Sequence, residues 1–171
     1  MSAYRERILA LLGDRSPSAA LDVACTRIEE LAGQLGEEGF SRSYEPGKWT
    51  AREILVHLAD AELATGFRLR QTLAEENHTV QPWDQDLWAR RYGAFDGRLA
   101  ARTFGALRLW NLALIQTLGP EELDRPVMHP ERGIESVGIM IRMLAGHDIN
   151  HLAQLERIAR QKNQAATEGR P

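Results

Sequence analysis

The chain has 171 residues, which suits one domain with a single buried core. Its net charge of -3 gives no basic excess for binding nucleic acid, and no apolar run reaches the roughly 20 residues of a membrane span. The first residues carry no secretion signal, so we expect a cytoplasmic protein. The only cysteine, Cys25, excludes an internal disulfide and a cysteine-rich zinc site, and its apolar neighbours predict a buried thiol.

Two helices are predicted in the first part of the chain. Residues 1–13 form a short leading helix, and Ser16 followed by Pro17 marks the start of a second, because proline suits the first helical turn. Apolar residues then recur at helical spacing until Gly36 weakens the pattern. Residues 37–49 are rich in Ser, Gly, Pro and Tyr and are expected to form a loop.

A third helix is marked by a capping box. The side chain of Thr50 can accept from the backbone N–H of Glu53, while the Glu53 carboxylate reaches back to the backbone N–H of Thr50. This helix is expected to run from about residue 51 to 76. Residues 77–97 contain proline, tryptophan and glycine and form a long connection, of a length that is often functional.

Two further helices are predicted in the second half. One runs from about 98 to 118, with an apolar stripe made of Leu99, Thr103, Ala106, Leu107, Trp110 and Leu114. Residues 119–135 form a loop with a short helical turn at 121–123. The last helix runs from about 137 to 161, and a disordered tail is expected from about 165. Four long helices without a convincing strand pattern predict one all-α domain over the whole chain, a four-helix bundle.

Two histidines one turn apart point to a metal site. His147 and His151 share one face of the last helix, and the same stripe carries apolar residues such as Met140 and Leu144. Neighbouring imidazoles in a core are costly unless their nitrogens are satisfied, and a metal ion satisfies them well. The alternative is a pair of core histidines hydrogen-bonded to carbonyls or to Asp148.

A third histidine, His57, lies in the first half of the capped helix, on a face with the small residue Ala61. Three inward histidines leave a coordination position open, which is typical of a catalytic rather than a structural metal. Taken alone, His57 would more often be a helix histidine with satisfied hydrogen bonds. His78 and His129 lie in predicted loops and are expected to be solvated, although His129 could border a pocket.

Five more residues are candidates for supporting this site. Asp60 and Asp148 each follow a candidate histidine closely and could accept an imidazole N–H, with surface or capping roles equally open. Arg68 lies about 16 Å further along the capped helix, where it could anchor a substrate carboxylate, although a salt bridge within the bundle is favoured. Trp83 and Trp88 could roof a pocket or cover the core from a loop. No general base is evident.

Two motifs surround the candidate histidines. The segment Pro46–Thr50 (Pro-Gly-Lys-Trp-Thr) leads into a helix with His57 and Asp60, and the second motif is Gly146–His151 (Gly-His-Asp-Ile-Asn-His). Together they resemble the DinB/YfiT-like superfamily, and most closely its YfiT-type members, which include bacillithiol transferases and proteins described as metal-dependent hydrolases. The resemblance covers roughly residues 17–160.

The resemblance implies an up-down-down-up four-helix bundle, often dimeric, in which a divalent metal is held by His57, His147 and His151. Many relatives have a further His or Gln after the last ligand, and here it is Gln154. Zinc and nickel both suit three imidazoles. The capped helix also has apolar residues away from its histidine face that could support a homodimer, namely Val56, Leu63 and Phe67.

Two reactions suit such a metal, because it can lower the pKa of a bound water or thiol, or polarise a carbonyl. Following the resemblance, we expect the transfer of a low-molecular-weight thiol to a small-molecule substrate. Hydrolysis of an ester or amide is the alternative. A third possibility is a stress or interaction protein whose metal has no catalytic role.

Overall fold

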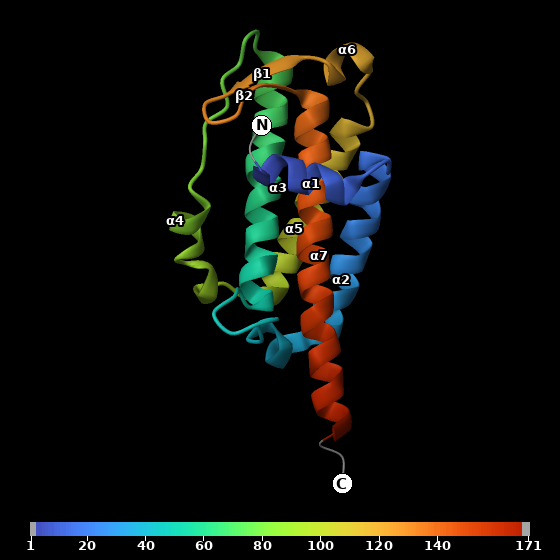
Figure 1. Ribbon diagram of the computed structural model, residues 1–171, viewed down its shortest axis with the longest axis vertical. Coiled ribbons are helices and arrows are strands. Elements are labelled where there is room, and N and C mark those ends of the chain that lie inside the picture. Colours follow the sequence, from blue (N-terminus) through green and yellow to red (C-terminus); the bar gives the residue numbers. More distant parts are fainter. Residues whose placement is uncertain (1–2, 169–171) are drawn as a thin grey trace.

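Four long helices form the body of the protein in the computed structural model, which describes residues 3–168, with side chains to residue 163. They are α2 (Pro17–Phe40), α3 (Ala51–Ala74), α5 (Gly97–Ile115) and α7 (Val137–Glu168). In Figure 1, α2 and α7 run in one direction and α3 and α5 in the other. The predicted four-helix bundle and its up-down-down-up order are confirmed. Because α3 and α5 are parallel neighbours, the chain returns along the outside of the bundle between them.

Short elements connect and cover the long helices. They are α1 (Ala3–Leu12), α4 (Gln85–Ala89), η1 (Tyr92–Ala94), α6 (Pro120–Leu123), β1 (Pro126–His129) and β2 (Gly133–Ser136). The short helix α1 lies across α7, and both α4 and η1 belong to the return connection between α3 and α5 (Figure 1). The helical turn predicted at 121–123 is present as α6.

An antiparallel hairpin of β1 and β2 was not predicted. Its register runs from the pair Pro126 and Ser136 to the pair His129 and Gly133. The prediction of a loop without strands over 119–135 was wrong because each strand has only four residues, too few for alternation to stand out. Gly133 has a φ of 80°, a conformation that glycine adopts without strain at the tight turn.

The starts of the long helices follow the signals in the sequence. The backbone N–H of Thr50 donates to Glu53 Oε2 at 2.7 Å, and the Glu53 N–H donates to Thr50 Oγ1 at 3.3 Å. This confirms the capping box and fixes where α3 begins. Ser16 caps α2 and Pro17 occupies its first turn, as predicted.

The ends of the helices were harder to predict. α2 does not stop at Gly36, which has a φ of 59°, but resumes after this kink and ends at the buried Phe40. Burial of the Phe40 ring stabilises the extra turn in a segment expected to be a loop. α7 continues to Glu168, so residues 165–168 of the expected disordered tail are helical, and residues 169–171 lie outside the described part of the chain.

Helix α5 turns a different face inward from the one predicted. Leu99 and Trp110, both from the predicted stripe, are 58% and 67% exposed. The buried face instead carries Phe104, Arg108 and Asn111. The prediction was wrong because two of these side chains are polar and find buried partners on neighbouring helices, so apolar spacing alone selected the wrong face.

A buried ionic network centred on Arg108 joins all four long helices. The Arg108 guanidinium donates to the carbonyl of Leu21 in α2 at 3.0 Å and to Glu62 Oε1 in α3 at 2.5 Å, and it lies 2.5 Å from Asp148 Oδ2 in α7. Asn111 donates to Glu62 Oε2 at 2.9 Å. Burial alone would lower the pKa of Arg108, but attraction to Asp148 and Glu62 outweighs it and raises the pKa. The guanidinium is therefore charged and fixes the helices relative to one another.

The short helix α1 approaches α7 very closely at Gly146. A Cβ atom at this position would overlap the backbone carbonyl of Ile8, so a glycine is needed for the two helices to meet here. Ile8 and Leu12 are fully buried beneath α1. This contact holds Tyr4, near the start of α1, beside the first third of α7.

Burial separates apolar residues that the sequence grouped together. Cys25 is 5% exposed and burial raises the pKa of its thiol to about 11, which confirms the expected buried thiol. Val56 belongs to the core and cannot join a dimer face, whereas Leu63 and Phe67 are 53% and 60% exposed. The homodimer and the cytoplasmic location stay predictions. Within residues 3–168, no helix has both the length and the apolar character needed to cross a bilayer.

Candidate metal centre

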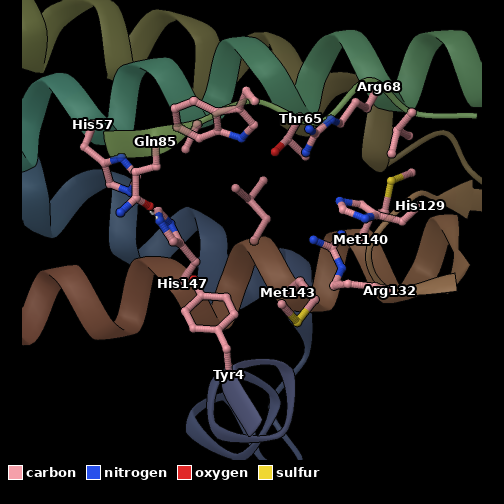
Figure 2. A pocket seen from close by; sticks show the side chains of 14 residues that line it. Tyr4, His57, Thr65, Arg68, Gln85, His129, Arg132, Met140, Met143 and His147 are labelled. Carbon is pink, nitrogen blue, oxygen red and sulfur yellow. Dashed lines mark hydrogen bonds between the residues drawn. The ribbon is translucent and has the colours of Figure 1, made fainter. Parts of the chain in front are cut away.

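A pocket of about 220 Å³ lies between α3 and α7, with Tyr4 of α1 and Gln85 of α4 in its lining. Figure 2 shows His57 and His147 at one end of the pocket, and three basic side chains at the other. The lining also includes six apolar side chains, those of Ala61, Val80, Trp83, Met140, Met143 and Leu144, and Figure 2 shows Thr65 between the two ends. The pocket therefore has two polar ends joined by a mainly apolar passage.

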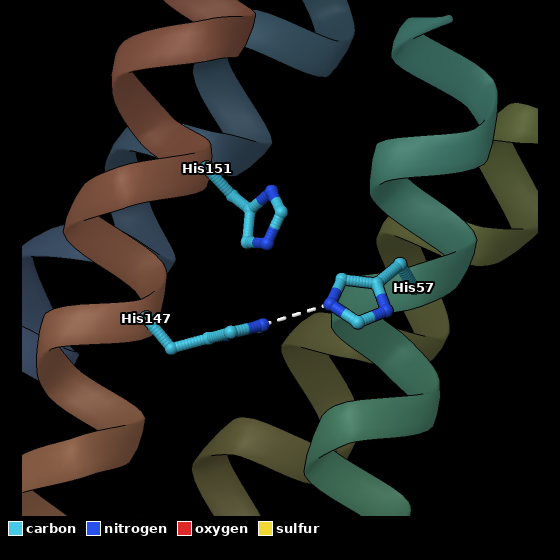
Figure 3. A group of neighbouring side chains, drawn as sticks. All are labelled: His57, His147 and His151. Atoms are coloured by element: carbon cyan, nitrogen blue, oxygen red, sulfur yellow. Dashed lines mark hydrogen bonds between the residues drawn. The ribbon is translucent and has the colours of Figure 1, made fainter. Parts of the chain in front are cut away.

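The three predicted ligands come together at the first end. His57 projects from α3 and His147 and His151 project from the facing side of α7 (Figure 3). One nitrogen of each lies within 4.8 Å of the others, and His57 Nε2 is 2.8 Å from His147 Nε2. Two ring nitrogens facing each other at this distance are satisfied by one proton between them or by a shared ion. Three converging imidazoles are a donor set that fits a divalent metal.

A neighbouring side chain lies beside each histidine of α7. His151 Nδ1 lies 2.8 Å from Gln154 Oε1, and because an amide oxygen only accepts, Nδ1 carries the proton and Nε2 presents its lone pair. His147 Nδ1 lies 3.5 Å from Asp148 Oδ1 without forming a hydrogen bond. Asp148 is 1% exposed and also pairs with Arg108, which excludes the surface alternative considered for it. Such outer partners set the direction of metal-binding imidazoles.

His57 and His147 share one feature of their surroundings. The Nδ1 atom of each is buried and has no hydrogen-bond partner among the described residues. Asp60, one turn further along α3, lies beside Tyr92: burial raises the pKa of the Asp60 carboxyl, and the Tyr92 hydroxyl partly offsets this. The predicted role of Asp60 as an acceptor for an imidazole N–H stays a prediction.

Burial keeps His57 and His151 neutral. Burial, followed by the proximity of His147, lowers the pKa of His151 to about 3. Burial, followed by the proximity of His147 and His151, also lowers the pKa of His57 far below its usual range. Neutral imidazole is the form that binds metals, so His57 and His151 are ready to bind at neutral pH without losing a proton.

We expect the metal-free protein to lose stability below about pH 6.5, the ordinary pKa of histidine. In the unfolded chain each imidazole takes up a proton there, whereas His151 in the folded protein stays neutral down to a pKa of about 3, and His57 to a lower value. The unfolded state then binds more protons, so the free energy of unfolding should fall by about 1.4 kcal/mol per pH unit for each histidine.

Chemical denaturation between about pH 7.5 and 4.5 measures this loss of stability. Other groups also titrate in this range, so the informative quantity is the difference between the wild type and the double variant His57→Gln, His151→Gln. The double variant should show a shallower fall of stability with decreasing pH. Parallel pH profiles for the two proteins would show that these histidines are not held neutral by the fold.

Aromatic rings surround the histidine end of the pocket. The ring centroids of Trp49 and Trp83 lie 4.9 Å and 5.8 Å from that of His57, and the Tyr92 ring lies 6.3 Å away. Trp83 lines the pocket, which agrees with the role of a roof over the site that was considered for it. Trp88 packs on Trp83 with centroids 4.8 Å apart, is 40% exposed and lines a neighbouring groove instead. These rings limit the access of water to the three nitrogens.

At the other end of the pocket, the structure differs from the expectations for Arg68 and His129. Arg68 Nη2 donates to the carbonyl of Gln81 at 2.5 Å, and no carboxylate of the described residues forms an ion pair with Arg68, so the favoured salt bridge is wrong. His129 is 3% exposed rather than solvated, because β1 carries it inward, and it borders the pocket. His78 lies outside this pocket and contacts Glu75 at 2.7 Å.

Some residues around the site were missed from the sequence. They are Trp49, Tyr92, Glu62 and Arg108. A signal for Arg108 was present, because it stands at helical spacing between Phe104 and Leu112, both buried. A charged residue within such a stripe predicts an opposite charge on a neighbouring helix. No comparable signal marks Tyr92, which reaches the site from the return connection.

The fold and the site together define a four-helix-bundle protein with a three-histidine cluster suited to a metal. A sequence profile described as the DinB superfamily matches residues 20–155, and the chain belongs to this superfamily. The predicted resemblance is confirmed.

Three similar proteins illustrate the relationship. Two are curated relatives from Oceanobacillus iheyensis, both named as proposed metal-dependent hydrolases. One is 32% identical over 130 residues, covering 75% of this chain and 76% of its own. The other is 29% identical over 140 residues, covering 80% and 79%. The third is a solved structure, that of YfiT from Bacillus subtilis, described as a probable metal-dependent hydrolase with an unusual four-helix bundle topology. It aligns with this chain with a TM-score of 0.70 and 22% identity, and the alignment covers 84% of this chain and 87% of that one.

Proposed function

We propose that the protein is a metal-dependent S-transferase that joins a low-molecular-weight thiol to a small electrophilic substrate, with zinc or nickel held by His57, His147 and His151. One observation carries the proposal: three imidazole ligands converge at the end of a pocket, and no described residue lining that pocket is a carboxylate. The bound ion would lower the pKa of a thiol. A thiol ionises with little assistance, since its ordinary pKa is already about 8.5, so no carboxylate base is required.

The residues of this chain then have defined tasks. Gln154 holds the imidazole of His151 in the direction needed for binding, and the Asp148 carboxylate lies beside the imidazole of His147. Trp49 limits the access of water beside His57 and His151. In the transfer itself, the thiolate sulfur forms the new S–C bond, the leaving group departs with the electron pair of the broken bond, and the thiol proton passes to solvent.

Hydrolysis of an ester or amide is the second candidate, and the names of the three relatives described above favour it. A metal can lower the pKa of a bound water to about 7, but departure of an alkoxide or amine also needs a group that donates a proton to it. His129 is the one other titratable imidazole in the pocket lining, but it lies at the end away from the cluster (Figure 2). This separation is why we favour transfer over hydrolysis.

The test compares the two reactions in one set of proteins. Protein without a histidine tag is loaded with zinc or nickel and assayed for conjugation of several cellular thiols to a generic aryl halide, and separately for hydrolysis of an activated ester. His151→Ala should lower conjugation at least about tenfold, because one of three ligands is lost. His78→Ala is the matched control, since His78 lies outside the pocket, and should leave the rate unchanged.

Equal conjugation rates in the wild type and His151→Ala would remove the transferase proposal. Ester hydrolysis that depends on His151, without any dependence of conjugation on it, would establish the hydrolase instead. Metal binding without either reaction would favour the non-catalytic stress or interaction protein.

A further inference from the structure

The end of the pocket away from the histidines is basic. Arg68 of α3, His129 of β1 and Arg132 of the hairpin turn all line it, and Figure 2 shows their nitrogen-bearing ends around the same space. We propose that this end binds a carboxylate of the substrate while the reacting group lies at the three-histidine cluster. The inference rests on the proposed function for the reacting end, but the basic end is argued from its own residues.

Arg68 is the cation available for this carboxylate. It donates one N–H to the carbonyl of Gln81, which holds the side chain in place without neutralising its charge. Burial, and then the proximity of Arg132, lower the pKa of Arg68, so the guanidinium lies in a partly desolvated and positive environment. A guanidinium has five N–H donors, and the fork that remains suits the two oxygens of a carboxylate.

Arg132 and His129 complete the basic end. Arg132 donates through Nε and Nη2 to the two carboxylate oxygens of Glu135, both at 2.8 Å, so its position is fixed. His129 Nδ1 accepts from the backbone N–H of Glu131 at 3.2 Å. The proton of the neutral imidazole is therefore on Nε2, which makes His129 a hydrogen-bond donor. Both side chains are held by neighbours in the hairpin.

Among the described residues, Arg68 forms no ion pair with a carboxylate. The two carboxylates that act on it are those of Glu135 and Glu131. Glu135 is already paired with Arg5 and Arg132, and Glu131 is exposed to solvent, which weakens its effect. A substrate carboxylate would supply the direct counter-charge for Arg68.

The fold also sets how far apart the two ends lie. Arg68 follows His57 by eleven residues, or about 16 Å along α3, but its long side chain leans back toward the start of the helix. The guanidinium and the histidine nitrogens are then on the order of 10 Å apart, across the apolar passage. We therefore infer a substrate with a carboxylate about that far from its reacting group, and with an apolar or weakly polar segment between them.

A first experiment tests the basic end without metal or thiol. Binding of octanoate and of octanol to the metal-free protein is measured by calorimetry. Octanoate should bind at least about tenfold more tightly than octanol, since a charge-assisted hydrogen bond contributes this much. Arg68→Gln should bring the ratio of the octanoate affinity to the octanol affinity close to one, and Arg68→Lys should restore part of the preference for octanoate. Arg70→Gln is the matched control, because it removes the same charge from α3 outside the pocket.

A second experiment includes the histidine end. The zinc-loaded protein is titrated with an eight-carbon straight-chain ω-mercaptocarboxylate, whose length matches the inferred separation, and with the corresponding mercaptoalcohol. Both thiols should bind more weakly to His151→Ala, and only the mercaptocarboxylate should bind more weakly to Arg68→Gln. A four-carbon mercaptocarboxylate is too short to reach both ends of the pocket, and it should bind no more tightly than the four-carbon mercaptoalcohol.

The outcomes separate the two proposals. If the mercaptoalcohol binds the wild type and the His151→Ala protein equally tightly, the proposed function fails. The octanoate result still decides whether the carboxylate site exists. If acid and alcohol bind equally to the wild type, or if Arg68→Gln and Arg70→Gln lower the ratio alike, the carboxylate site is wrong. If inorganic phosphate binds the metal-free protein more tightly than octanoate, and depends on Arg68, the ligand is a phosphate and the assignment to a carboxylate is overturned.

Discussion

Replacing Arg108 by methionine should lower the free energy of unfolding by about 3–5 kcal/mol, the usual result of removing one partner from a buried ion pair. The guanidinium is fully buried, and its loss leaves Glu62 and Asp148 as two buried carboxylates without a cation. Each would have to take up a proton or draw water into the core. Denaturation by urea, followed by circular dichroism, measures the change in midpoint.

A compensated variant keeps this prediction testable. The triple variant Glu62→Gln, Arg108→Met, Asp148→Asn removes the charges together, and should recover most of the loss because no buried carboxylate remains. Arg98→Met provides a control on the same helix, since its ion pair with Glu37 is exposed and contributes little. A change in the free energy of unfolding below about 1 kcal/mol for Arg108→Met would show that Glu62 and Asp148 do not depend on this guanidinium for their counter-charge.

Zinc should stabilise the wild-type protein by about 4 kcal/mol when free zinc exceeds the dissociation constant a thousandfold. His57→Gln should abolish this gain, because it leaves the two ligands of α7 without the one from α3. Gln154→Leu should weaken zinc binding by about 10–100-fold, since His151 loses the acceptor that orients it. His78→Gln should behave as the wild type.

Metal content provides an independent measurement of the same prediction. After repletion and removal of excess ion, the wild type should hold close to one metal per chain and His57→Gln below about 0.2. Equal metal content in the wild type and the His57→Gln protein would mean that any bound ion lies elsewhere. Unchanged affinity in Gln154→Leu would show that the contact with His151 does not orient the imidazole.

The helices that carry the site were predictable because their signals are local. The capping box of Thr50 and Glu53 sets the start of α3, and the three-to-four residue spacing of His147 and His151 puts both on one face of α7. Whether the imidazole of His57 lies close to those of His147 and His151 depends on how α3 packs against α7, and no local sequence pattern predicts that packing. The helical face of His57 and its small neighbour Ala61 made it a candidate, and the family resemblance added the expectation that it shares a metal with the other two.

Two of the failures share a physical cause, since contacts with distant parts of the chain decide which polar side chains are buried. The inner face of α5 was misassigned because Arg108 and Asn111 are stabilised by Glu62, which lies in a different helix. His129 was expected in solvent because nothing near it in sequence shows that a hairpin carries it to the pocket. Long-range partners of this kind decide burial, and apolar spacing does not report them.

The close contact of α1 with α7 at Gly146 has a practical consequence for purification. The contact brings the first turn of α1 to the pocket, where Tyr4 is part of the lining. A polyhistidine tag at the N-terminus would therefore start within reach of the three-histidine cluster and could offer its own imidazoles to the metal. At its other end α7 extends beyond the rest of the bundle (Figure 1), so a tag placed there is held away from the pocket.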